Sequence, residues 1–168
     1  MPKTPRSGPD GLRAAHLVAA ARALLDAGRS RTDDAHLRRA ESTAYYAMVH
    51  CLARVCADRL ATSGGAPLRF RTRQNVYRAL LHNRARQRCR DERLLAAYPA
   101  VIREFARGFV RLQTRRQSAD YDPTVVVENS DARRHVEHAA RLIRAFENAP
   151  EADLRDFALR VLLAERED

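Results

Sequence analysis

Apolar residues recur three and four positions apart along most of this chain, which is the period of an amphipathic helix and not of a strand. The pattern is clearest after Pro99, where Ile102, Phe105, Phe109 and Leu112 form one apolar stripe. The stripe should end at 122–123, because the residue before a proline avoids the helical conformation. Comparable spacing predicts further helices over about 9–27, 33–61, 73–83, 91–98, 130–147 and from Pro150 onward.

The same survey finds no convincing β-strand. The best candidate is the short run 124–127, and the chain has only six glycines and no tryptophan. Alanine, leucine and arginine favour helix. We therefore predict an all-α fold, an antiparallel bundle of four or five helices with a C-terminal accessory helix. The predicted parts are a polar N-terminal segment (1–10), the bundle (11–148) and the C-terminal helix (149–168).

The last helix carries an apolar face made of Leu154, Phe157, Val161 and Leu162. Two interpretations of this face are open. It could pack against the chain's own bundle, or it could dock a partner protein.

The chain is strongly basic. Its 168 residues include 31 Lys and Arg against 21 Asp and Glu, for a formal net charge of +10. Lys3 is the only lysine, a preference typical of a GC-rich genome, but such a genome does not explain the net charge. A basic surface attracts polyanions, most often nucleic acid. The most basic stretch, residues 69–93, holds nine arginines against Asp91 and Glu92.

The cysteines and the hydropathy of the chain indicate the cellular compartment. Cys51, Cys56 and Cys89 are odd in number and lack the spacing of metal ligands, so we expect free thiols in a reducing compartment and no metal or cofactor. The first ten residues do not resemble a signal peptide. No run approaches the roughly 20 apolar residues that cross a membrane. We expect a cytoplasmic protein without a membrane segment.

An arginine interrupts the apolar stripe of the helix after Pro99. Continuing the steps of three and four leads to Arg116, whereas its neighbour Arg115 lies off the stripe. A buried arginine is costly unless it is paired or faces a cleft. Asp120, four residues later, is within reach of an ion pair. The two could be an ordinary pair at a helix end, or the arginine could be held at a cleft to bind phosphate.

A second unusual set lies on the long helix over 33–61. Ser42, Tyr46 and His50 are four residues apart and share one helical face. They could be a satisfied buried polar group or the lining of a pocket. No further ligand is spaced to make a metal site with them.

These two segments carry a family resemblance. Ala44-Tyr45-Tyr46-Ala47-Met48-Val49-His50, followed much later by Arg116 and Ala119-Asp120-Tyr121-Asp122-Pro123, resembles the HEPN superfamily. The closest branch has a "YYA-x-x-H" helix and an "R-x-x-ADYDP" helix end. The segment 76–82 resembles the stretch between those motifs, and the resemblance covers roughly residues 35–147.

The resemblance implies an antiparallel bundle that often forms homodimers, and in many members a metal-independent ribonuclease of a toxin–antitoxin, antiviral or RNA-processing system. The usual signature is an arginine followed within four to six residues by a histidine. The arginine would hold the scissile phosphate, and the histidine would act as base or acid while the 2′-hydroxyl attacks.

The chain departs from that signature, because Tyr121 stands where the histidine is expected. Arg133 and His138 have a nominal signature spacing, but so many arginines make chance matches common. We hypothesise that His50 supplies the imidazole from the facing helix. The candidate catalytic residues are Arg116, Asp120, Tyr121 and His50, and the candidate RNA-binding residues are Tyr46, Arg78, His82, Arg84 and Arg115.

The leading functional hypothesis is therefore RNA binding or cleavage by a HEPN-like protein. The alternative is a non-catalytic partner or regulatory protein that pairs with a nucleotidyltransferase, an antitoxin or another effector. A DNA-binding helical domain is the third possibility, although no clear helix-turn-helix pairing is visible.

Overall fold

The computed structural model describes residues 13–28, 34–63 and 66–163 of the chain. The predicted polar segment over 1–10 lies outside these residues. The described part is helical apart from a hairpin of two-residue strands, β1 (Thr62–Ser63) and β2 (Ala66–Pro67), so the prediction of an all-α fold is confirmed. The helices are α1 (Ala14–Ala27), α2 (Asp34–Leu60), α3 (Phe70–Arg78), α4 (His82–Arg90), α5 (Glu92–Leu95), α6 (Ala100–Tyr121), α7 (Asn129–Glu147) and α8 (Glu151–Leu162).

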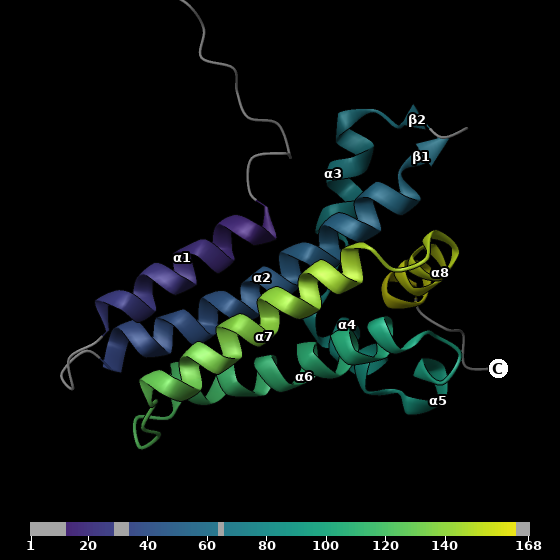
Figure 1. Ribbon diagram of the computed structural model, residues 1–168. Coiled ribbons are helices and arrows are strands. Elements are labelled where there is room, and N and C mark those ends of the chain that lie inside the picture. Colours follow the sequence, from purple (N-terminus) through teal and green to yellow (C-terminus); the bar gives the residue numbers. More distant parts are fainter. Residues whose placement is uncertain (1–12, 29–33, 64–65, 164–168) are drawn as a thin grey trace, which may run out of the picture.

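Helix α2 is the centre of the bundle. It packs against α1, α3, α6, α7 and α8, while α6 also contacts α7 and α4. Helices α1 and α6 run antiparallel to α2, and α7 runs in the same direction as α2 (Figure 1). Among the described residues, no helix is both long and apolar enough to cross a membrane.

An aromatic cluster joins the last three helices. The rings of Phe105 on α6 and Phe146 on α7 stack with centroids 3.9 Å apart, and Phe157 on α8 meets Phe146 edge-on at 6.0 Å. All three side chains are fully buried, as are Leu154 and Val161 on the same face of α8. The apolar face of α8 therefore packs against the chain's own bundle, which decides between the two interpretations of that face.

Helices α6 and α7 approach each other closely at Gly108. A Cβ atom built at this position would lie 2.1 Å from Cδ1 of Leu142 on α7. A larger residue would force the two helices or the Leu142 side chain to move. The glycine thus sets the spacing of α6 and α7.

The basic stretch after β2 differs from the prediction. A single helix over 73–83 is wrong, because α3 ends at Arg78 and α4 begins at His82. Leu81 between them has an extended backbone (φ −94°, ψ 122°), which interrupts the helical period. Leu80 is buried as expected, but Leu81 is 55 % exposed instead of facing inward.

The end of α6 agrees with the sequence. The helix stops at Tyr121, directly before the Asp122–Pro123 pair, and the run 124–127 forms no strand. The chain then crosses to α7 in a short segment, which keeps α6 and α7 as antiparallel neighbours.

Truncation of the central aromatic residue tests this account of the core. We expect Phe146→Ala to lower the free energy of unfolding by about 3–5 kcal/mol, because it removes contacts to two rings and leaves a cavity. The measurement is urea denaturation followed by circular dichroism. Leu159→Ala on the exposed side of α8 is the control and should change stability by less than about 1 kcal/mol. Equal losses in the two variants would contradict the assignment of the core.

Candidate functional site

One face of α2 carries polar residues at a spacing of four: Arg38, Ser42, Tyr46 and His50. This face meets the C-terminal end of α6 and the basic helices α3 and α4, as the contacts below show. Ser42 is 1 % exposed, so its hydroxyl needs a protein partner. The candidate site is built along this line.

The first pair in the site is Arg116 and Asp120, one turn apart on α6. Nε of Arg116 lies 2.7 Å from Oδ2 of Asp120, and the two side chains are 21 % and 20 % exposed. The Ser42 hydroxyl on α2 contacts both carboxylate oxygens, at 2.8 and 2.9 Å. The predicted ion pair therefore exists, and α2 holds its carboxylate in place.

Two tyrosines flank the guanidinium. Nη2 of Arg116 donates to the hydroxyl of Tyr46 on α2 at 3.3 Å and approaches the hydroxyl of Tyr121 at 3.5 Å. Its Cζ atom lies 5.6 and 5.5 Å from the two ring centroids, within range of cation–π attraction. Tyr121 is 73 % exposed, so its ring stands at the protein surface. Among the described residues, the contacts of this guanidinium run through Nε and Nη2, and no hydrogen bond of Nη1 is found.

His82, the first residue of α4, lies next to this group. Its ring centroid is 6.4 Å from that of Tyr46, and its Nδ1 lies 3.1 Å from the hydroxyl of the buried Tyr45. Partial burial, and then the positive charge of Arg116, lower the pKa of His82. Burial raises the pKa of Tyr45, which keeps its hydroxyl protonated. At neutral pH the exposed His82 side chain is therefore a neutral imidazole that can accept a proton.

His50 lies one step further along α2. Its Nδ1 is hydrogen-bonded to the hydroxyl of Tyr77 on α3, with ring centroids 5.9 Å apart. Partial burial, and then the charge of His82, lower its pKa. Within the described residues no contact joins His50 to Arg116. Of these two histidines, only His82 has a pKa that the charge of Arg116 lowers.

Three of the predicted RNA-binding residues lie elsewhere. Arg84 donates from Nη1 to the backbone oxygen of Leu162 at 2.8 Å and so ties α4 to α8. Arg78 is exposed at the end of α3. Arg115 is exposed on the side of α6 that faces α7, where it lines a hollow with His135. The site thus gathers Arg116, Asp120, Tyr121, Tyr46 and His82, with His50 at its edge.

Sequence reasoning missed Arg38. Its guanidinium donates to the backbone oxygens of Ala119 at 2.8 Å and Asp122 at 2.9 Å, and also to that of Val125. It holds the end of α6 and the following turn, where Asp120 and Tyr121 are located. The signal was present, because position 38 extends the series 42, 46 and 50 by one helical turn.

Comparison with known proteins identified no relative of this chain. A scan against protein-family models and searches of curated proteins and solved structures found no match to this chain. In the part of the chain that the structure describes, no three His, Cys, Asp or Glu side chains gather as a metal site would require. The function is therefore inferred from the motifs and from the chemistry of the cluster.

Arg38 provides a stability test of the site. We expect Arg38→Met to lower the free energy of unfolding by about 1–3 kcal/mol, because three partly buried backbone carbonyl groups lose their donor. Hydrogen exchange should accelerate selectively at the backbone amides of 119–125. Arg39→Met, at the exposed neighbouring position, is the control. Unchanged exchange in this segment would show that Arg38 does not hold the end of α6.

The lowered pKa of His50 predicts a pH dependence. The unfolded chain, with an imidazole pKa near 6.5, binds a proton that the folded protein binds only at lower pH. The free energy of unfolding should therefore fall as the pH is lowered through about 6.5. His50→Gln should reduce this slope between about pH 7.5 and 5.5, as measured by urea denaturation at each pH. Parallel curves for the two proteins would contradict the assignment.

Proposed function

We propose that this protein is an RNA-directed member of the HEPN superfamily and that the Arg116 cluster is its phosphodiester site. The two motifs support the family, and the cluster supports the site. The observation that carries the proposal is the arginine itself: Asp120, held in turn by Ser42, pairs with Arg116 while the arginine side chain stays 21 % exposed. Arginine in a fixed orientation is well suited to bind a phosphate group.

The surroundings of Arg116 favour a single-stranded substrate. The ring of Tyr121 is largely exposed beside the guanidinium. An exposed aromatic ring can stack on an unpaired base, whereas the bases of a duplex are already stacked on each other. A phosphate on Arg116 and a neighbouring base on Tyr121 would occupy the site together.

The proposed reaction is metal-independent cleavage of RNA, as in a toxin–antitoxin or defence system. Arg116 holds the non-bridging phosphate oxygens, and the imidazole of His82 accepts the proton of the 2′-hydroxyl. The 2′-oxygen then bonds to phosphorus as the bond to the 5′-oxygen breaks, and the leaving 5′-oxygen takes a proton from water, which yields a 2′,3′-cyclic phosphate and a 5′-hydroxyl. His82 replaces His50 in this role, because it lies beside Tyr46 and Arg116.

Binding without cleavage is the second candidate function. The observation in its favour is Tyr121, since a tyrosine with an ordinary pKa near ~10 is a poor base at neutral pH. In this case the protein would serve as the RNA-binding or regulatory half of a pair, with a nucleotidyltransferase or another effector. In either case a homodimer would double the basic surface.

A cleavage assay with matched variants tests the proposal. The purified protein is incubated with total RNA in EDTA beside Arg116→Ala, and we expect Arg116→Ala to reduce cleavage by about 100-fold or more. Arg107→Ala is the control: it removes the same charge from α6, where Arg107 forms an exposed ion pair with Glu92 of α5. His82→Ala and His50→Ala in the same assay identify the imidazole.

The outcomes separate the candidate functions. Cleavage lost in Arg116→Ala but kept in Arg107→Ala supports the ribonuclease. Salt-sensitive RNA binding without cleavage, lost in Arg116→Ala, supports the binder. If wild-type protein neither binds nor cleaves RNA, the proposal is wrong and a purely structural role for the cluster remains.

A further inference from the structure

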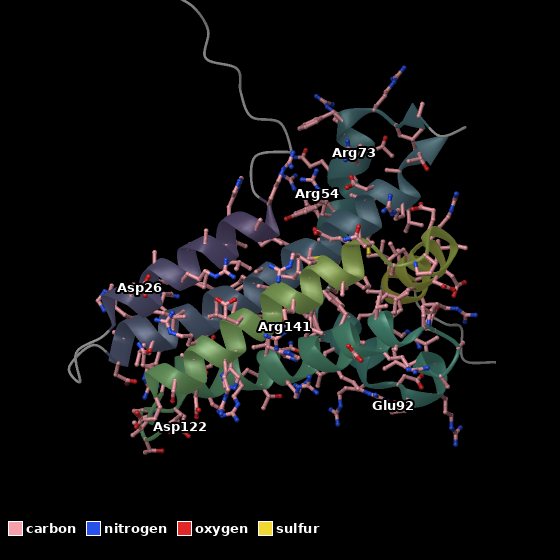
Figure 2. The ribbon with its side chains drawn as sticks, viewed as in Figure 1. Asp26, Arg54, Arg73, Glu92, Asp122 and Arg141 are labelled. Carbon is pink, nitrogen blue, oxygen red and sulfur yellow. The ribbon has the colours of Figure 1, made fainter. Side chains whose placement is uncertain are left out.

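A trough begins between α6 and α7, on the side of α6 that Arg115 faces, and continues over α7. Its first hollow, of about 350 Å³, is lined by both helices; its second, of about 390 Å³, is lined by α7 alone, and the two share His135 and His138. We call this feature the α6–α7 trough. Arg141 lies on α7 at its edge (Figure 2).

The cations of the trough differ in their partners. Arg133 pairs with Asp26 at 3.1 Å, and Arg134 pairs with Asp131. By contrast, Arg111, Arg115 and Arg141 are exposed, and within the described residues no carboxylate lies at ion-pair distance from them. The trough therefore has an excess of unneutralised positive charge.

Two of these arginines converge on one imidazole. Nη2 of Arg111 lies 3.1 Å from Nε2 of His138, and Nη2 of Arg141 lies 3.3 Å from its Nδ1. A neutral imidazole has one acceptor nitrogen, and a protonated one has none. At least one guanidinium thus faces an N–H group, and an anion between the two arginines would remove this conflict.

A buried carboxylate orients the second histidine. Oε1 of Glu41 on α2 lies 2.6 Å from Nδ1 of His135, and Glu41 is only 4 % exposed. A carboxylate at Nδ1 places the proton on that nitrogen and leaves Nε2 as the free nitrogen of the ring. His135 is thereby held rigidly in the wall that both hollows share.

The first hollow also has an apolar wall. Gly108, Val110 and Leu112 line it together with Arg111. Its volume, about 350 Å³, is within the range of small-ligand sites, which are mostly apolar with a few polar groups. Apolar surface beside arginine planes suits a base and ribose, and paired guanidinium groups suit a phosphate.

We propose that the α6–α7 trough is a second binding site, specific for a nucleoside phosphate, either free or as one unit of an RNA strand. The phosphate lies between Arg111 and Arg141 and replaces their contacts with His138. The base and ribose lie over Val110 and Leu112. The site does not depend on the Arg116 cluster, which occupies another face of α6.

Imidazole NMR of the full chain tests the proposal, with AMP, inorganic phosphate and a short single-stranded RNA as separate probes. We expect AMP to shift the signals of His135 and His138, and to raise the pKa of His138. Burial, and then Arg111, Arg141 and His135, lower that pKa in the free protein, whereas Glu104 raises it. The signal of His82 reports separately on the Arg116 site.

The key variant is Arg111→Gln/Arg141→Gln. Both side chains are exposed and unpaired with carboxylates, so the fold should persist, which helical circular dichroism verifies. We expect AMP affinity to fall at least about tenfold. Arg39→Gln/Arg155→Gln removes the same charge from exposed positions on α2 and α8, away from the trough, and is the control.

The probes also identify the source of the phosphate. Shifts with AMP alone indicate a free nucleotide, and shifts with the RNA alone indicate a strand; both support the site if the key variant abolishes them. The proposal is overturned if no probe shifts His135 and His138. It is equally overturned if the control variant weakens binding as much as the key variant, or if inorganic phosphate binds as tightly as AMP and RNA.

Discussion

Enclosure of α2 is the constraint on which the structure depends. Helices α1, α3, α6, α7 and α8 pack against it, so its polar side chains must find partners inside the protein. Arg38 binds the backbone at the end of α6, Ser42 binds the carboxylate of Asp120, and Tyr46 receives a hydrogen bond from Arg116. The contacts that satisfy the central helix are the same contacts that hold the candidate site in position.

Helix α6 divides the basic charge between two faces. Arg115 and Arg116 are adjacent in the chain, but a helix turns about 100° per residue, so they point to different neighbours. Arg116 meets α2 and is held by Asp120, whereas Arg115 faces α7 and the trough with His135. The net charge therefore comes from two chemically different surfaces. One holds a single arginine between two tyrosines, and the other holds arginines that have no carboxylate partner among the described residues.

The predictions from the sequence agree best with the structure where they rest on residues close together in the chain. The apolar stripe of α6, its stop before Pro123 and the selection of Arg116 over Arg115 follow from helical period and proline geometry. The prediction over 73–83 failed because an extended residue, Leu81, breaks the period that the pattern assumed. That break starts α4 at His82 and brings its imidazole beside Tyr46, whereas His50, the residue expected there, meets Tyr77.

The sequence by itself determined an all-α chain, the limits of its long helices, and the ion-pair spacing of Arg116 and Asp120. Only the tertiary structure decided which histidine stands beside the arginine, that Arg38 holds the end of α6, and that Arg111 and Arg141 meet at His138. The physical reason is the distance along the chain over which each interaction acts. Helical period and capping act over a few residues, whereas these contacts join segments whose approach depends on the packing of the whole bundle around α2.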